Sequence, residues 1–301
     1  MDLFDKTVRH DGWSVTGCLV LVALLVLLAA PCAMQAQNIG WEGETGVFVT
    51  PLAYTAASPD TGLGKPMVGF HFLNGGPVLG DFYEASVTEG VFGRVEFGYT
   101  RPLHSQSGDP TFGSLWTNGF NIVHGKVNVI KENAWKTKWV PAFSIGVIDR
   151  SHVHEVGGVV WGRFTRNQDF YAVATKLIPQ TKVIPLLLTA GVRETNGELW
   201  GMGGNTPTYQ AKVFGSIGFV VKLPKKASVV FASEIAQQPK HPDSLPNAVI
   251  PTTLTYAARL SPAPESKLNI DFGVAQIAGT IEPGVNLKAR HQLGMQVGYQ
   301  F

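Results

Sequence analysis

The last eleven residues of the chain, HQLGMQVGYQF, alternate strictly between apolar side chains and polar or small ones. Leu293, Met295, Val297, Tyr299 and Phe301 share one parity, and glutamines and glycines occupy the other. A period of two residues indicates a β-strand with one apolar face. Chain ends are usually polar and poorly ordered, so an end that stops on an aromatic residue must be held by neighbouring structure.

Comparable alternation recurs along the chain, in runs that reach 15 residues. Most strands of soluble folds have about five or six residues, whereas a tilted strand that crosses a bilayer needs about 9–11. Thirty-four glycines and 19 prolines separate the runs, and no helical periodicity is sustained. The predicted fold class is therefore all-β, and the run length favours a transmembrane antiparallel β-barrel.

The connections between these runs alternate in length from residue 88 onward. Short ones are expected at 88–91, 131–137, 178–183, 224–226 and 261–266, and longer ones at 102–115, 149–167, 194–208, 237–249 and 276–288. Outer-membrane barrels combine short periplasmic turns with longer extracellular loops. The alternation predicts about twelve strands, with ten to fourteen allowed, near 67–73, 81–88, 92–101, 117–130, 138–149, 168–177, 184–194, 209–222, 227–236, 250–260, 267–275 and 289–301.

The first 36 residues have the order of segments found in a secretory signal peptide. Charged residues precede the apolar run CLVLVALLVLLAA, and small residues follow it. The run is short for a membrane-spanning helix, which makes an uncleaved anchor the weaker alternative. A lipoprotein is disfavoured because Pro31 precedes Cys32. Export to the outer membrane through a cleaved signal is the expected localisation.

Both cysteines, Cys18 and Cys32, lie in this leader, so the exported chain would have neither disulfides nor cysteine metal sites. Without the leader the chain keeps 22 Lys+Arg against 19 Asp+Glu, because residues 1–36 hold two bases and three acids. This charge is too small to indicate nucleic acid as a partner. No cofactor motif is present, and the solute of a channel stays unknown.

Residues 67–301 are predicted to form the barrel, and residues 37–66 are left outside the count. The stretch GETGVFVTPLAY at 43–54 is expected to plug the lumen, to precede the wall or to form a further strand. A secreted β-sandwich with a buried edge strand is the alternative fold, although it has no reason to keep the alternation of loop lengths.

Several charged residues share the parity that would face the lumen. They are Arg94, Glu96, Arg193, Lys212, Glu234, Arg259 and Asp271. Three interpretations stay open: they line an aqueous pore, they form part of a polar ligand pocket, or they form ion pairs that fill a narrow barrel. We expect Arg259 to bridge Glu234 and Asp271, because the three residues lie on consecutive predicted strands.

Evidence for catalysis is weak. His152 and His154, in SHVHE, would share one face of an extended chain and with Glu155 are weak candidates for a metal site, but no third ligand has a recognisable spacing. No serine–histidine pair suggests a hydrolase, so a non-enzymatic protein is expected and a barrel hydrolase is the third option.

The second half of the chain resembles a family of uncharacterised bacterial outer-membrane proteins, the domain of unknown function numbered three thousand and thirty-four. The resemblance rests on FYAVATKLI at 170–178, LLLTAGVRETNGELWGMGG at 186–204, VVKLPKKASVVFASEIAQQPKHPD at 220–243, LNIDFGVAQIAG at 268–279 and LGMQVGYQF at 293–301. It implies an outer-membrane barrel and supplies no reaction or ligand.

The end of the chain also looks like the C-terminal signal that the barrel assembly machinery reads, with Gly298, Tyr299 and Phe301 matching its pattern. Outer-membrane lipid and that machinery are the expected partners. The expected function is a channel or small-solute transporter, and the alternative is a structural or envelope-interaction barrel with a filled lumen.

Overall fold

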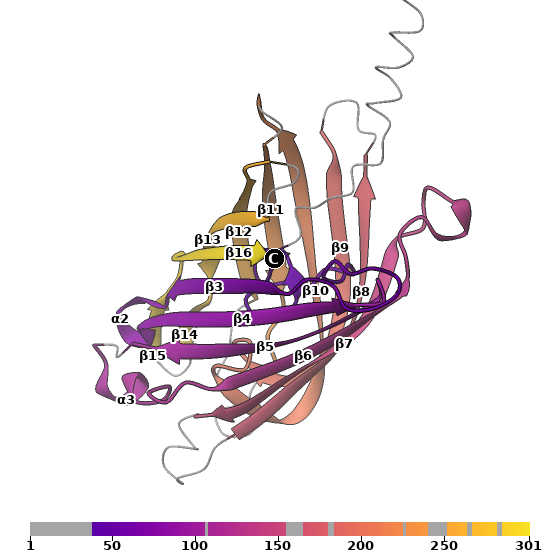
Figure 1. Cartoon of the computed structure of the whole chain (residues 1–301). Coiled ribbons are helices and arrows are strands. Elements are labelled where there is room, and N and C mark those ends of the chain that lie inside the picture. The colour runs from indigo at the N-terminus through magenta and orange to yellow at the C-terminus, as the bar shows by residue number, and fades with distance from the viewer. Residues whose placement is uncertain are drawn as a thin grey trace, which may run out of the picture. The chain divides into compact units, whose positions relative to one another are not determined.

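Twelve antiparallel strands form a closed barrel in the computed structural model, which describes residues 38–105, 108–154, 165–179, 184–224, 227–239, 252–263, 267–281 and 285–301 (Figure 1). The strands of the wall are β3 (Met67–Asn74), β4 (Asp81–Val91), β5 (Val95–His104), β6 (Asn121–Ile130), β7 (Ala142–Val153), β8 (Thr165–Ile178), β9 (Leu186–Glu198), β10 (Gly204–Lys222), β11 (Ser228–Ala236), β12 (Thr253–Ser261), β13 (Leu268–Gln276) and β16 (Gln292–Gln300).

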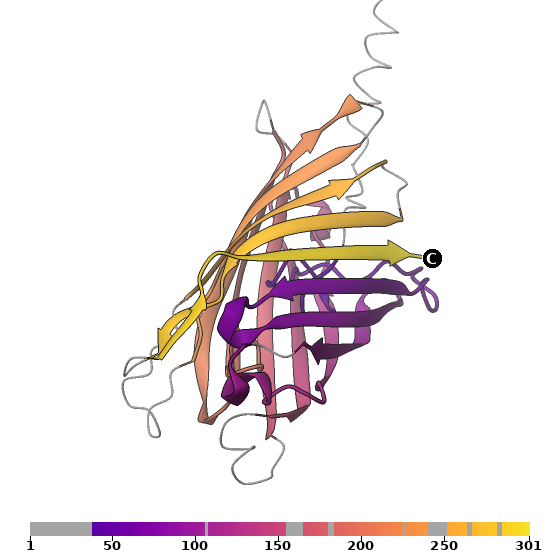
Figure 2. The ribbon, with the colours of Figure 1, turned by 90° about the vertical axis from the view of Figure 1, so that its left-hand side faces the viewer.

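The last strand closes the barrel, as Figure 2 shows where yellow β16 lies beside indigo β3. β16 pairs with β13 on one side and with β3 on the other, so that Gln300 lies opposite Met67. The backbone N–H of Phe301 donates to the carbonyl of Pro66 at 3.1 Å. The aromatic end is held because closure leaves no free edge for the strand to fray from.

The predicted twelve-strand barrel is confirmed, and each predicted strand overlaps an observed one. The strict alternation of connection lengths is wrong at two places. The connection between β6 and β7, predicted as short, spans eleven residues at 131–141 and is as long as the connection that follows β7. The predicted long connection at 194–208 is a tight turn at 199–203, because β9 and β10 continue toward each other past a bulge between Asn205 and Gln210. The extended parts of β9 and β10 consist largely of polar and glycine residues, so they lack the apolar alternation from which the strands were predicted.

We call the end of the barrel at Met67 and Gln300 the turn end and the opposite end the loop end. The loops at the loop end carry α2 (Gly76–Leu79), α3 (Pro110–Gly113) and the hairpin of β14 (Ala278–Ile281) and β15 (Val285–Ala289). The turn between β6 and β7 contains the 3-10 helix η1 (Ala134–Lys136). Among the described residues, each helix is too short or too polar to span a membrane.

The two faces of the wall differ sharply in chemistry. Each of the twelve strands exposes at least one large apolar side chain on its outer face, such as Phe70, Val123, Val213, Tyr256 and Leu293. The inner face carries buried polar and charged side chains, which is the reverse of a soluble protein. Strand alternation therefore places apolar groups outside and polar groups inside.

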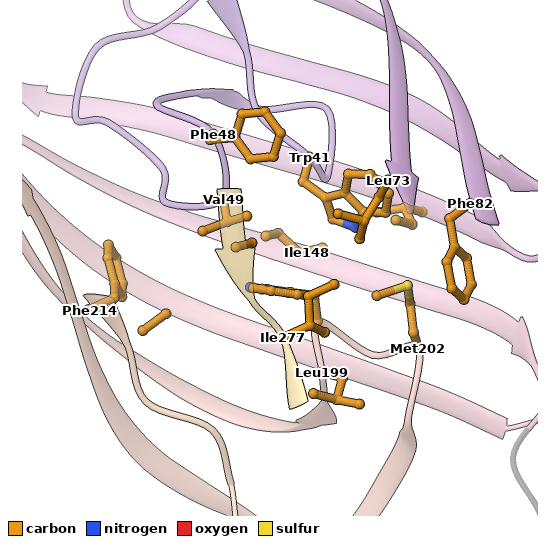
Figure 3. Close-up of a cluster of buried hydrophobic side chains, with 14 of the residues drawn as sticks. Trp41, Phe48, Val49, Leu73, Phe82, Ile148, Leu199, Met202, Phe214 and Ile277 are labelled. Carbon is orange, nitrogen blue, oxygen red and sulfur yellow. The ribbon is translucent and has the colours of Figure 1, made fainter. Parts of the chain in front are cut away.

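Apolar side chains close the loop end (Figure 3). Leu199 and Met202, from the turn between β9 and β10, lie in one cluster with Trp41, Phe82 and Ile277. In the same cluster, the indole N–H of Trp116 donates to the carbonyl of Met202 at 2.8 Å. We call the buried residues Leu115, Trp116, Leu199, Met202 and Ile277, which lie in the connections at this end, the loop cap.

Candidate functional site

The stretch before the wall lies inside the barrel, and we call residues 38–57 the inner segment. Every side chain from Asn38 to Ala53 is buried. Strands β1 (Asn38–Ile39) and β2 (Thr45–Gly46) pair with each other, and further backbone hydrogen bonds, such as Trp41 N–H to the carbonyl of Phe48, lie within the segment. A buried N–H or C=O without a partner is costly, and side chains of the wall supply partners for several of the other backbone groups.

Glu234 of β11 holds one side of the inner segment. Its carboxylate accepts hydrogen bonds from the backbone N–H groups of Phe48, Val49 and Thr50 at 2.9–3.2 Å, and from the hydroxyl of Thr50 at 2.6 Å. A carboxylate that receives several N–H donors is stabilised in a buried position. Glu234 is thus a clamp on the main chain rather than a free charge in the lumen.

Arg259 of β12 holds the carbonyls next to that clamp. Its guanidinium donates to Asp271 of β13 at 2.8–3.0 Å and to the carbonyls of Gly46 and Val47 at 3.1 and 2.5 Å. The expected bridge is found on the Asp271 side. Glu234 lies elsewhere, opposite Thr255 in the strand register, and its oxygens are occupied by the inner segment.

Glu96 of β5 and Lys126 of β6 hold the opposite side of the inner segment. Their ion pair measures 3.1 Å and is fully buried. Glu96 accepts from the backbone N–H groups of Thr45 and Ala56, while Lys126 donates to the carbonyls of Thr45 and Leu52. Both charges are therefore compensated by each other and by peptide dipoles.

A second network of ion pairs lies closer to the loop end of the barrel than the pair of Glu96 and Lys126. Arg150 of β7 forms an ion pair with Glu42 of the inner segment and pairs with Asp169 of β8 at 2.8 Å. Arg193 of β9 also reaches Asp169 at 3.3 Å and lies 5.3 Å from the ring centre of Phe214. One cation of the wall thus ties the inner segment to two neighbouring strands.

Glu44 and Glu84 differ from these paired acids. Glu44 is in the inner segment and Glu84 is on β4, both are buried, and neither carboxylate has a hydrogen-bond partner among the described residues. The nearest cross-strand neighbour of Glu84 is His71, whose Nδ1 lies 3.8 Å from Glu84 Oε2. Trp41 lies beside His71 with ring centres 6.1 Å apart. We call these four residues the acid face.

Burial raises the pKa of Glu44 to about 8, and the nearby carboxylate of Glu42 adds to this shift. The backbone and Lys126 oppose the shift, but they do not cancel it. The physical cause is the loss of hydration of the charged form. Glu44 is therefore neutral when the inner segment is docked at pH 7.

The structure places the other predicted lumen residues unequally. Arg193 is buried, whereas Lys212 of β10 is only half-buried. Arg94 is exposed in the turn before β5, where it donates to the carbonyls of Asn128 and Val129. The prediction of a lumen position for Arg94 is wrong because the strand predicted from residue 92 begins only at Val95, which leaves Arg94 in the preceding turn.

At the predicted assembly signal, Tyr299 and Phe301 expose their rings and pack edge to face, with ring centres 5.3 Å apart. Gly298 faces inward against Asn38 of the inner segment, where a Cβ atom would lie 1.7 Å from Asn38 Oδ1. The contact requires glycine for space. Recognition of these three residues by an assembly machine stays a prediction.

The weak metal candidates do not come together with a third ligand in the described part of the chain. His152 is exposed at φ 62° and its Nδ1 lies 3.3 Å from Asn121 Nδ2. His154 is half-buried, and Glu155 lies outside the described residues. No group of three or more His, Cys, Asp or Glu side chains suited to a metal occurs among the residues described.

Sequence reasoning missed half of the groups that hold the inner segment. Glu42, Glu44, Glu84, Lys126 and Arg150 were not singled out. Parity could have found three of them, because Glu84, Lys126 and Arg150 share the inward parity of their strands. The acids of the inner segment have no such signal, since the segment has no sustained period.

Comparisons with known proteins give similarity of fold only. No family model matches the chain. No curated protein matches it either. Among solved structures, the NanC porin aligns with 78% of this chain and 98% of its own, at 9% identity and a TM-score of 0.44. The β-domain of the Bordetella autotransporter BrkA aligns with 80% of this chain and 99% of its own, at 12% identity and a TM-score of 0.38. Both scores are below 0.5, and neither likeness bears on the function of this chain.

Proposed function

We propose that the protein is an integral outer-membrane β-barrel whose lumen is closed by its own inner segment. The observation that carries this proposal is the outer face of the wall, where all twelve strands expose large apolar side chains. Exposed apolar surface on every strand would be a liability in water, and it is the surface that a lipid bilayer covers. Closure of the wall removes the unpaired edges that hydrocarbon does not tolerate.

The contents of the lumen favour a filled barrel over an open channel in this conformation. The inner segment forms hydrogen bonds with residues of β4, β5, β6, β7, β8, β11, β12 and β16, and the loop cap covers the loop end. A segment bound on so many sides occupies the space that a solute would have to cross. The closed, filled barrel is therefore better supported than a permanently open pore.

A gated channel is the second candidate, and the polarity of the wall favours it. The side chains that hold the inner segment are mainly charged or hydroxylated, and most of their bonds go to its backbone. Water can replace such partners, so the cost of release comes mainly from the apolar side chains of the segment, such as Trp41, Phe48 and Leu52, which are buried when it is docked. A polar wall is also what an aqueous lumen requires.

Electrophoresis of the membrane fraction with and without boiling tests the barrel. A folded barrel migrates differently until it is boiled and leaves the membrane only with detergent. A soluble band without a heat shift would contradict the proposal, and the exposed apolar face would then need another cover.

Planar-bilayer recording separates the two candidates. We expect the wild-type protein to be silent at pH 7, because the inner segment is docked. The substitution Glu234→Ala removes the clamp on Phe48, Val49 and Thr50, and Ser261→Ala is the matched control on the neighbouring strand, because its hydroxyl bonds Asn269 instead. Openings in Glu234→Ala alone would support a gated channel, and silence in both variants would support a permanently filled barrel.

A further inference from the structure

Two buried acids at the boundary between the inner segment and the wall lack compensation. Glu44 and Glu84 carry four carboxylate oxygens, and none of them has a hydrogen-bond partner among the described residues. By contrast, Glu96, Glu42 and Glu234 each meet a cation or several N–H groups. Glu44 on the segment acts electrostatically on Glu84 on the wall, and the pair is hard to explain as filler, since two charges there would repel each other.

The surroundings of the acid face do not supply the missing positive charge. Glu44 interacts electrostatically with Glu42 of its own segment, Glu96 of β5 and Lys126 of β6, and it acts in turn on Tyr171 of β8. Lys126 is already paired with Glu96 at 3.1 Å.

Glu84 has the same deficit. His71 of β3 lies beside it, Glu42 and Glu44 act on it from the inner segment, and Arg150 of β7 is the cation that acts on it. Arg150 is already paired with Glu42 and Asp169. The acids of this region therefore outnumber the cations left to compensate them.

We propose that the acid face is a proton-operated latch, in which protons on Glu44 and Glu84 hold the inner segment docked and their loss releases it. The inference rests on the proposed closure of the lumen by the inner segment. When the carboxyls are neutral, the two sides of the contact do not repel. When both are ionised, two uncompensated charges repel each other in a buried region, and hydration of Glu44 in the released segment relieves that cost.

The raised pKa of Glu44 sets the direction and the range of the response. Its folded value of about 8 exceeds its ordinary value of 4.5. Below 4.5 the group is protonated whether docked or released, so docking is strongest there. Between 4.5 and 8 only the released segment ionises, and the ratio of released to docked segment rises by up to about tenfold per pH unit. Above 8 the ratio levels off.

A cysteine reporter measures the release without depending on conductance. Val49 is buried in the inner segment, and Val49→Cys keeps a small apolar side chain there. A water-soluble thiol reagent labels this cysteine only when the segment leaves. Thr117→Cys, at an exposed loop position, corrects for the ionisation of the thiol itself, and the parent chain gives the background from Cys18 and Cys32. The readout is the ratio of the two labelling rates in proteoliposomes from pH 4.5 to 9.

Matched variants identify the groups responsible. We expect the ratio to rise between pH 5 and 8 in the reporter and to stay low at every pH with Glu44→Gln, which imitates the protonated acid. Glu84→Gln should also lower it, and it provides a second test if Glu44→Gln does not give a heat-shifted band. Glu42→Gln is the control from the same segment. Because Glu42 is paired with Arg150, its loss should raise labelling at all pH values. Because its charge adds to the pKa shift of Glu44, its loss should narrow the pH response without abolishing it.

A ratio that does not change with pH would overturn the latch. So would a pH response that persists in both Glu44→Gln and Glu84→Gln. Either result would leave the proposed barrel intact, provided that the band shifts on boiling, whereas a soluble band without a heat shift would remove the barrel itself.

Discussion

Two acids of the wall meet the inner segment in opposite ways. Glu234 of β11 accepts four hydrogen-bond donors from residues 48–50, while Glu84 of β4 has no donor among the described residues and is acted on electrostatically by Glu42 and Glu44 of the segment. Both side chains are about 1% exposed, so burial does not distinguish them. The difference lies in what the inner segment presents to each.

This difference shows that a buried carboxylate is not by itself stabilising or destabilising. Three N–H groups in succession offer partial positive charge to Glu234 and offset part of the cost of burying it. At the acid face the segment brings further carboxylates near Glu84, so the same residue type opposes docking unless it is neutral. One side of the barrel holds the segment by hydrogen bonds, and the other makes its release depend on the protonation of Glu44.

The largest effect is expected from breaking the Glu234 clamp. Glu234→Ala leaves three N–H groups and the Thr50 hydroxyl without their acceptor, which should weaken docking by about 5 kcal/mol if each lost bond costs about 1–2 kcal/mol. Labelling of Val49→Cys should become fast and independent of pH. Labelling that stays slow in Glu234→Ala, as in the Ser261→Ala control, would show that the clamp does not hold the segment.

A somewhat smaller loss is expected from Arg150→Met. The change leaves Glu42 and Asp169 buried without their shared cation, and removing one partner of a buried pair costs about 4 kcal/mol. Unlike Glu234→Ala, it should also destabilise the wall itself, because Asp169 belongs to β8. The temperature at which the folded band converts to the unfolded band should fall, and an unchanged conversion temperature would contradict the role of this network.

Glu44→Gln should strengthen docking, and only above the ordinary pKa of the acid. At pH 7 the docked acid binds a proton that the released one has lost, and removing this requirement should stabilise docking by at most about 3 kcal/mol. Near pH 4 the variant and the wild type should label at the same rate. A gain that is as large at pH 4 as at pH 7 would point to packing instead of protonation.

The smallest effect on docking is expected from a substitution of Gly43, the residue before Glu44. Gly43 has φ +96°, and a Cβ atom there would lie 2.2 Å from Thr100 Oγ1. Gly43→Ala should cost about 2 kcal/mol through backbone strain and this contact. Docking should weaken equally at pH 5 and pH 8, because no titrating group is changed. A pH-dependent loss would mean that Gly43 acts through the position of Glu44.

The sequence by itself determined the wall. Alternation over runs such as 268–275 and 292–300 fixes which side chains face out, because a strand has a period of two and an antiparallel partner preserves it. The number of strands followed from the runs and the turns between them. The boundary at Val95, which leaves Arg94 in the turn before β5, did not follow, since the alternation of side chains does not mark the residue at which a turn ends and a strand begins.

Only the tertiary structure decided what fills the barrel. Residues 38–57 have no period, and their partners on the wall lie 32 to 249 positions away, such as Ile39 with His71 and Val47 with Gln296. Contacts of this kind depend on which inward positions of separate strands come to one height after closure. Strand spacing and register set those heights, and they are properties of the assembled wall rather than of any run of residues. The uncompensated pair of Glu44 and Glu84 became visible only there.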